Sequence, residues 1–368
     1  MSMMATHRTL NRPTDPFNDL PLLPPARDLE TKPILKAAID AHVALADLRG
    51  ATRTIPNDSI LVRAIALQEA RVSSEIEMIV TTSDELFRAL SQDEASADPQ
   101  TKEVLRYSDA VWLGHNHLQN GGRLDNELFD QLATTILQRP IGIREGSGTR
   151  VGDVRTGKVI YTPPIGSGRI KGMLENLTEY WDSNNGVDPL IRLCVGHYQF
   201  EAIHPFHDSN GRVGRVLNIL YLIQKRLLDK PILYLSRAII DDKPSYYRGL
   251  RKVTEEGAWE QWVIYMLDNI ASTSIETRRR VEAISLELDA SIQKAKDRMQ
   301  RGYSMELIRL IYSQPYSRIV FLERAGIAKR QSASEYLQEL ERIGLLRGVR
   351  RGREVYYVND KLLTILTA

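Results

Sequence analysis

The side chains best suited to chemistry lie within twelve consecutive residues, from His204 to Arg215. Imidazole groups ordinarily titrate near neutral pH, so the side chain of His204 is a candidate acceptor for the proton of a hydroxyl group. Asp208 offers the hard oxygen ligands that suit a Mg²⁺ ion bridging two phosphates. Phe206, between them, is an apolar side chain that can hold the loop against a core. The stretch therefore contains a candidate base and a candidate metal ligand four residues apart.

The second half of the same stretch is suited to binding an anion. The pair Asn210-Gly211 permits a left-handed turn, which lets successive backbone N–H groups face an anion. An apolar helical pattern follows at Val213, Val216, Leu217, Leu220 and Ile223. We therefore expect the loop to open a helix, and helix N-termini favour phosphate. Arg212 and Arg215 are three residues apart, so both can offer a bidentate fork to one side of the pocket.

Composition excludes several classes of protein. The 368 residues are 42% hydrophobic and 26% charged, with a net charge of +2, which is ordinary for a globular protein with two or three domains. Cys194 is the one cysteine, so no internal disulfide can form, which fits a reducing cytoplasm. Its apolar neighbours favour a core position over a nucleophile. No apolar run reaches about 18 residues, and the N-terminus does not resemble a signal peptide.

Hydrophobic periodicity predicts a mainly α chain with five segments. These are an extended Pro-rich arm over 1–33, a helical region over 34–137, a core over 138–270, a helical linker over 271–300 and a separate unit over 301–368. Within the second segment, the helices of 98–137 break at Asn120-Gly121-Gly122. Further helices are expected at 171–182, 187–200, 209–227, 236–257 and 258–298.

Two short β-hairpins interrupt the helical pattern. Residues 139–170 are rich in Gly and Pro, and the runs 150–154 and 158–162 flank Arg155-Thr156-Gly157, which is typical of a hairpin. In the last segment, helices at 304–312, 316–324 and 331–343 precede a second hairpin at 345–358. Three helices followed by a hairpin are the order of a winged helix-turn-helix.

The twelve-residue stretch resembles the motif HPFxDGNGRxxR of the Fic family, and every position but Ser209 matches. The resemblance implies an all-helical fold in which the motif joins two central helices. It also implies transfer of AMP from ATP to a hydroxyl of a protein, with release of pyrophosphate. His204 would then deprotonate the acceptor hydroxyl, and Asp208 would hold Mg²⁺.

The same resemblance assigns the remaining motif residues to the nucleotide. Asn210, Gly211 and Arg212 would hold the phosphates and Arg215 the γ-phosphate, with Ser209 and Gly214 completing the loop. Ser209 stands where the family usually has Gly, and its side chain narrows the anion site.

A second resemblance concerns regulation. Ser73 and Glu77 lie four apart on an expected helix and so share a face, which alone would indicate a solvated helix. Beside the Fic motif they resemble the family's inhibitory sequence (S/T)xxxE(G/N), although Met78 departs from Gly or Asn. The resemblance implies that Glu77 pairs with Arg215 and competes with the γ-phosphate, acting in cis.

Two more sites follow from the resemblance. The hairpin at 150–162 occupies the place of the family's flap, where an exposed strand edge at Ile160 and Tyr161 could pair with an extended target segment. A surface hairpin that only covers a core is the alternative. In the family, one of two paired tyrosines after the motif lines the adenine pocket. Tyr247 is the candidate here, although core packing explains such a residue equally well.

The C-terminal segment is basic, with twelve Lys or Arg residues against seven Asp or Glu over 301–368. Lys329, Arg330, Gln331, Ser332 and Ser334 open the expected recognition helix, and such residues suit contacts to phosphates and bases. DNA binding, a protein-docking role and a merely solvated basic face all remain open.

Three hypotheses for the whole chain follow. The first is an autoinhibited protein adenylyltransferase that uses ATP and Mg²⁺. The second is a DNA-binding transcriptional regulator whose Fic-like core senses nucleotide. The third keeps the core but changes the donor or removes AMP. The target protein, the acceptor residue (Ser, Thr or Tyr) and a homodimer are left open.

Overall fold

The structure is a computed structural model that describes residues 13–53, 58–91, 97–146, 148–153, 156–184, 186–351 and 354–367. The described residues form two compact units. Unit 1 takes residues from Met1–Ala46, Arg106–Pro231 and Leu235–Thr273, and unit 2 from Asp47–Leu105, Ile232–Tyr234 and Ser274–Ala368. Three of the boundaries fall within helices: α1 (Lys32–Arg53), α4 (Pro99–Gln119) and α11 (Trp259–Arg298). Each unit is therefore assembled from segments far apart in the sequence.

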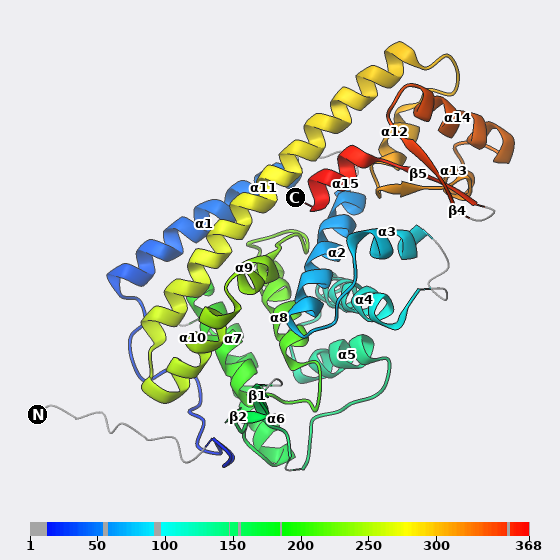
Figure 1. Ribbon diagram of the computed structural model, residues 1–368. Coiled ribbons are helices and arrows are strands. Elements are labelled where there is room, and N and C mark those ends of the chain that lie inside the picture. The colour runs from blue at the N-terminus through cyan, green and yellow to red at the C-terminus, as the bar shows by residue number, and fades with distance from the viewer. Residues whose placement is uncertain are drawn as a thin grey trace, which may run out of the picture. The chain divides into compact units, whose positions relative to one another are not determined.

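Unit 1 is built around two nearly fully buried helices, α7 (Pro189–Ile203) and α8 (Asn210–Gln224) (Figure 1). A helix that is apolar on all sides belongs in the middle of a protein. Helix α6 (Ser167–Asp182) packs on α7, and α5 (Asn126–Leu137) packs on α8. Helices α9 (Leu235–Asp241) and α10 (Lys243–Glu256) complete the unit. The expected mainly helical fold is confirmed.

Side-chain caps explain where these helices begin. The carboxylate of Asp188 accepts from the Leu190 N–H at 2.8 Å, and Pro189 starts α7 in the position that proline favours. Asp125 caps α5 through the Leu128 N–H in the same way. Asp242 caps α10 through the N–H of Ser245 and separates it from α9, so the helical signal over 236–257 is divided between two helices. The reason is that an Asp side chain bonds readily to a nearby backbone N–H and ends the preceding helix.

The predicted first hairpin is confirmed. Strands β1 (Val151–Asp153) and β2 (Lys158–Tyr161) pair antiparallel, with a bulge between Val151 and Gly152. The described part of the N-terminal arm, residues 13–31, forms no helix, as expected, but it contains turns and bends and is not uniformly extended. Hydrogen bonds attach it to the rest of unit 1. The N–H of Phe17 donates to the carbonyl of Thr162 at 2.9 Å, and the side-chain amide of Asn176 bonds both the N–H and the carbonyl of Leu23.

Unit 2 joins helices α2 (Asp58–Ile76) and α3 (Ser83–Ser91) to the C-terminal elements (Figure 1). The expected three helices are α12 (Met305–Ile311), α13 (Ile319–Arg324) and α14 (Arg330–Arg342). The expected hairpin is β4 (Arg347–Arg351) with β5 (Glu354–Val358). A short strand β3 (Tyr316–Ser317) pairs with β5, and helix α15 (Asp360–Thr367) ends the described chain. Neither β3 nor α15 was predicted.

The two unpredicted elements connect the sequence-distant parts of unit 2. Helix α15 packs on α2, and α3 packs on β3, where the hydroxyl of Tyr316 bonds the carboxylate of Asp84. Across the described ranges, we find no helix with the length and apolar character needed to cross a bilayer.

Candidate active site at the junction of α7 and α8

The loop that contains the candidate base connects the two buried helices. His204 ends α7 in the left-handed conformation, with φ 50° and ψ 60°, and its N–H donates to the carbonyl of Phe200 at 3.0 Å. Histidine is among the residues that tolerate this conformation. Pro205 has no N–H with which to continue the helix. Phe206 is fully buried, as predicted, and anchors the loop in the core.

The side chain of Asn210 closes this loop. Its Oδ1 accepts from the N–H of Phe206, and its Nδ2 donates to the carbonyl of Phe206, both at 2.8 Å. The left-handed turn predicted at Asn210-Gly211 is therefore wrong, because both residues already belong to α8. Ser209 makes the turn instead, with φ 66° and ψ 9°. Its strain is offset locally, because its N–H donates to Asp208 Oδ1 and its hydroxyl to the Asp208 carbonyl, both at 2.6 Å.

The first turn of α8 has the geometry that suits an anion. The first helical bond runs from the N–H of Val213 to the carbonyl of Ser209 at 2.9 Å. The first N–H groups of an α-helix, here those at the start of α8, point away from the helical bonds toward an incoming ligand. Together with the helix dipole, they favour a negative ligand, as predicted for a helix opened by this loop.

Two arginines place positive charge beside this turn. The side chains of Arg212 and Arg215 both lie on α8 with only 2% of their surface exposed. Nη2 of Arg212 lies 3.5 Å from Oδ1 of Asp208, whose side chain is 56% exposed. Because burial reduces screening by water, the field of the two guanidinium groups is strong at the helix start. The exposed Asp208 can reach a cation that arrives with a phosphate.

The chemistry of Asp208 fits magnesium held jointly with a substrate. Among the described residues, no cluster of three or more His, Cys, Asp or Glu side chains could hold a metal alone. Mg²⁺ in phosphoryl-transfer sites is commonly bound by one or two carboxylates together with the phosphates. A single exposed carboxylate at an anion site fits that mode.

Sequence reasoning missed Arg144, which supports the loop from behind. Its buried guanidinium donates from Nε to the carbonyl of His204 at 2.7 Å, and from Nη2 to the carbonyls of Pro164 at 2.6 Å and Ile203 at 3.0 Å. Its own N–H donates to the Pro205 carbonyl at 3.0 Å. Burial lowers the pKa of Arg144 from its usual range. One side chain thus ties the end of the hairpin segment to the backbone of the candidate base.

The hairpin residues divide between surface and core. Ile160 is 39% exposed, whereas the hydroxyl of Tyr161 donates to the carbonyl of Ala202 on α7 at 2.8 Å. Burial raises the pKa of Tyr161 well above its usual value, so the phenol stays protonated and keeps this bond. Tyr161 therefore anchors the hairpin, and Ile160 belongs to its outer surface.

A second missed residue, His197, joins three helices beside the site. Its Nε2 lies 2.8 Å from the hydroxyl of Tyr246 and its Nδ1 lies 3.1 Å from the amide of Asn218. Burial first, and then the charge of Arg215, lowers the pKa of His197 to about 3, so the ring is neutral at physiological pH. The only signal in the sequence was a polar residue within the apolar run of α7.

The paired tyrosines have different environments. Tyr246 is 1% exposed and bonded to His197, whereas Tyr247 is 41% exposed, with Nζ of Lys243 at 5.9 Å from its ring centre. Between the two, Tyr247 has the ring face that could stack on a base. It stays the candidate for the adenine end.

In unit 2, the predicted inhibitory segment lies at the end of α2. The helix ends at Ile76, one residue earlier than the prediction requires for Glu77. Ser73 is 0% exposed and Glu77 is exposed, so the two do not share one environment. Glu77 lies beyond the last helical residue, in the turn where Met78 adopts φ 67° and the chain changes direction.

The helix end is a Schellman motif. The N–H of Met78 donates to Glu75 and the N–H of Ile79 donates to Ser74, both at 3.0 Å. This motif favours Gly or Asn at the left-handed position, which Met78 occupies here. The departure of Met78 from the inhibitory sequence thus coincides with the strained residue of the turn.

Comparison with known proteins adds three sequence matches. The Fic/DOC family matches residues 124–222, the N-terminal region of that family matches 35–116, and the C-terminal domain of SoFic-like protein adenylyltransferases matches 288–362. The chain is 29% identical over 89 residues to the probable protein adenylyltransferase aq_aa38 of Aquifex aeolicus (strain VF5), covering 24% of this chain and 25% of that protein. It is 32% identical over 83 residues to the protein adenylyltransferase fic-1 of Caenorhabditis briggsae, covering 21% and 15%. The matches thus span a quarter or less of these relatives.

Solved structures share the fold. A Fic family protein from Desulfovibrio desulfuricans G20 superposes with a TM-score of 0.59 at 19% identity, covering 91% of this chain and 98% of that one. A Fic domain containing signaling protein from Bacteroides thetaiotaomicron VPI-5482 gives a TM-score of 0.50 at 16% identity, covering 67% of this chain and 95% of that one.

Replacement of Arg144 by Lys should loosen the loop and the hairpin together. One ammonium group cannot reach three carbonyls in the fork geometry of a guanidinium. We expect a loss of about 2–3 kcal/mol in unfolding free energy and faster amide hydrogen exchange at both 161–165 and 203–206. The exposed Arg139→Lys is the control. Unchanged exchange in Arg144→Lys would contradict the assigned role.

Replacement of Met78 by Gly should stabilise the end of α2. Glycine adopts positive φ without the steric penalty of about 1–2 kcal/mol that other residues meet. Because Met78 is 75% exposed, the change removes little packing. We expect urea unfolding to shift to a higher midpoint, whereas Met78→Ala, which keeps the strain, should give no gain.

Proposed function

The chain belongs to the Fic/DOC family, and from that premise we propose that it is a protein adenylyltransferase. It transfers AMP from ATP to a Ser, Thr or Tyr hydroxyl of a protein and releases pyrophosphate. The observation that carries the proposal is the pair of buried arginines at the first turn of α8, directly after the loop that presents His204. Such a turn is suited to the negative charge of a polyphosphate.

The reaction balances with the residues of the loop. His204 accepts the proton of the acceptor hydroxyl, whose oxygen attacks the α-phosphorus of ATP. The bond between that phosphorus and the bridging oxygen breaks, and pyrophosphate leaves. Arg212 and Arg215 stabilise the charge on the phosphates, because preorganised donors in a partly dry site act more strongly than in water. Asp208 would hold Mg²⁺, and a bound Mg²⁺ would supply positive charge for the phosphates.

Two further regions would contact the adenine base of ATP and the target protein. The exposed ring of Tyr247 is the proposed platform for adenine, and Lys243 above it adds positive charge. The outer edge of the hairpin near Ile160 would pair with an extended segment of the target. Because Tyr161 and Arg144 anchor the hairpin, that edge would hold the acceptor hydroxyl at a defined place relative to His204.

Autoinhibition is a further part of the proposal. Glu77 would pair with Arg215 and compete with the γ-phosphate, so that ATP binds without reacting. The support is the sequence pattern from Ser73 to Glu77 together with the exposed position of Glu77 in the turn after α2. A charge-assisted Arg–carboxylate bond is strong enough to compete for one phosphate group.

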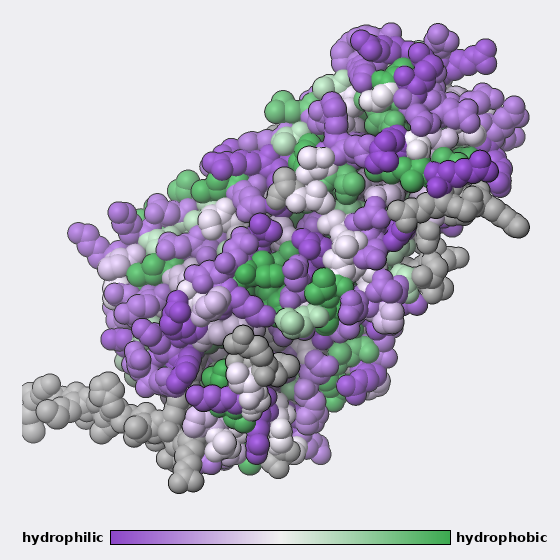
Figure 2. All heavy atoms as spheres, in the orientation of Figure 1, coloured by the Kyte–Doolittle hydropathy of each residue, from purple (hydrophilic) through white to green (hydrophobic). Residues whose placement is uncertain are grey.

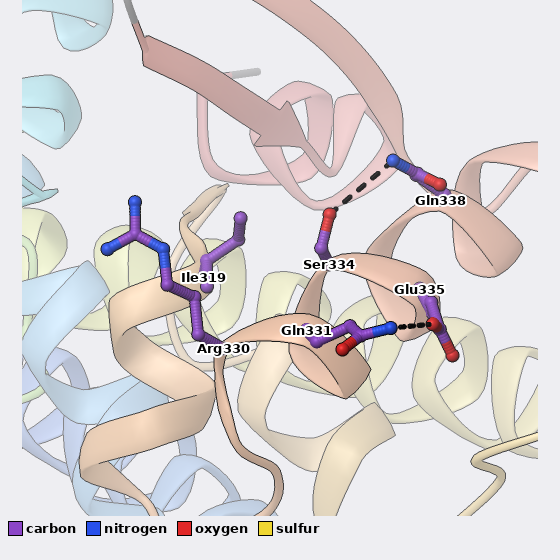
Figure 3. A pocket seen from close by; sticks show the side chains of 6 residues that line it. All are labelled: Ile319, Arg330, Gln331, Ser334, Glu335 and Gln338. Carbon is purple, nitrogen blue, oxygen red and sulfur yellow. Dashed lines mark hydrogen bonds between the residues drawn. The ribbon is translucent and has the colours of Figure 1, made fainter.

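The C-terminal elements favour a second candidate function, binding of double-stranded DNA. Arg330, Gln331, Ser334 and Gln338 on α14, together with Ile319 and Glu335, line a hollow of about 530 Å³ (Figure 3). Arg and Gln are the side chains that most often read guanine and adenine in the major groove. Exposed Lys329, just before α14, would contact phosphate. The chain would then have DNA binding in addition to AMP transfer. In the alternative hypothesis of a DNA-binding regulator that senses nucleotide, DNA binding would replace AMP transfer.

AMP transfer is tested by intact-mass spectrometry of the purified chain with MgATP. We expect an AMP adduct, and His204→Ala should slow its formation by about 10²- to 10⁴-fold, the usual contribution of a general base. Glu77→Gln should raise the rate about tenfold or more, if the pair is worth about 1.5–3 kcal/mol. Glu75→Gln, which alters a carboxylate paired with Arg71 on α2, is the control. Transfer that survives in His204→Ala would contradict the mechanism.

DNA binding is tested by fluorescence anisotropy of the full chain with a mixed-sequence duplex. We expect affinity that falls steeply with salt, and Arg330→Ala should weaken it by about 1–3 kcal/mol. Arg342→Ala is the control, because that side chain is already paired with Glu339 at 2.6 Å. Equal losses in both variants, or no salt-dependent binding at all, would exclude this interface.

A further inference from the structure

The described part of the N-terminal arm, residues 13–31, is attached to unit 1 along its length (Figure 1). Near its middle, Nε2 of Gln199 on α7 donates to the carbonyl of Pro21 at 2.9 Å. Near its end, the hydroxyl of Thr31 donates to Oε2 of Glu260 on α11 at 2.9 Å. A terminal segment is well ordered when it is tied down in this way. The arm is therefore a fixed part of the unit, although it lies outside the three family matches.

The beginning of this arm contacts the segment that directly follows strand β2. The hydroxyl of Thr162 donates to the carbonyl of Pro13 at 2.7 Å, and the carbonyl of Thr162 accepts from the N–H of Phe17 at 2.9 Å. Oδ1 of Asn18 accepts from the N–H of Ile165 at 3.0 Å. These three bonds satisfy polar groups of a segment that lies beyond the paired residues of the hairpin.

The arm gives the hairpin a third support. The hydroxyl of Tyr161 bonds the carbonyl of Ala202, and the guanidinium of Arg144 bonds the carbonyl of Pro164, so two supports lie toward the end of α7. A rigid body held at two points can still rotate about the line between them, and a third contact outside that line prevents the rotation. The arm adds contacts from a different element, including the ring of Phe17, which lies edge-on to the ring of Tyr161 with centroids 6.3 Å apart.

The position of the hairpin matters for how a target would bind. Most of the visible surface of the protein is hydrophilic, with smaller hydrophobic areas between (Figure 2). An extended target segment would therefore be held mainly by backbone bonds to the hairpin edge. Because the carbonyl of Thr162 is already bonded to Phe17, that pairing can extend only as far as Tyr161.

We propose that residues 13–18 of the arm are a positioning element for AMP transfer. They set where the target-binding edge ends, and they fix its orientation relative to His204. This inference rests on the proposed function. It matters for the rate because an acceptor that is displaced by about 1 Å can react about a hundredfold more slowly.

Asn18 allows this role to be tested without changing a hydroxyl group that could itself accept AMP. Asn18→Leu keeps the size of the side chain but removes the acceptor for the N–H of Ile165. Asn18→Asp keeps an acceptor oxygen at the same place. Leu22→Ala, which changes a 56% exposed side chain of the same arm, is the control.

Three measurements on the full chain are compared. Amide hydrogen exchange over 158–165 should be about tenfold faster in Asn18→Leu, because one support of the hairpin is lost. Formation of the AMP adduct with MgATP, followed by intact-mass spectrometry, should be about tenfold slower. Calorimetric affinity for MgATP should not change, because the three bonds of residues 13–18 go to the hairpin segment and not to α8. Asn18→Asp and Leu22→Ala should behave as the unmodified chain.

Each other outcome overturns the inference. Unchanged exchange in Asn18→Leu would show that the arm does not hold the hairpin. Faster exchange with unchanged adduct formation would show that the contact has no part in AMP transfer. Weaker MgATP binding in Asn18→Leu, or an equal loss in Asn18→Asp, would assign the effect to another cause. An unmodified chain that forms no adduct would overturn the proposed function itself, and the positioning role with it.

Discussion

The bond pair between the amide of Asn210 and the backbone of Phe206 is the constraint on which the site depends. It closes a loop of a few residues between two helices that are buried almost entirely. Because both helix ends are fixed by packing, the loop must reverse within that length. It does so with two left-handed residues, His204 and Ser209. The candidate base and the first turn of α8 are thus set relative to each other by the same few bonds.

Support for this loop comes from groups outside the motif. Arg144 binds the carbonyls at the end of α7 and the carbonyl of Pro164, so the hairpin and the loop share one guanidinium group. Such carbonyls have no partner within the helix, and a buried cationic donor satisfies them more strongly than a neutral one. His197, held neutral by burial and by Arg215, fixes Tyr246 on the other side. The site is therefore held by buried polar contacts from several elements.

In the second unit, a strained residue lies next to the segment proposed to inhibit the enzyme. Met78 occupies a left-handed position at the end of α2, where glycine would be more stable. Unit 2 also combines α2 and α3 with the C-terminal elements through α15 and β3. The segment proposed to restrain the enzyme and the elements proposed to bind DNA thus belong to one compact body.

The sequence by itself determined the helical class, most helices, both hairpins and the identity of the chemical motif. Those features depend on periodicity and on residues adjacent in the chain, such as Val213 to Ile223 or His204 to Arg215. Only the tertiary structure decided that Ser209 makes the turn, that Arg144 and His197 support the site, and that residues 47–105 fold with the C-terminal elements. Each of these depends on contacts between residues far apart in sequence or on competition between local bonds. The amino-acid sequence does not reveal such contacts. Arg144 and Arg139 are the same residue type in the same segment, and only the packing of the folded chain buries Arg144 and leaves Arg139 exposed.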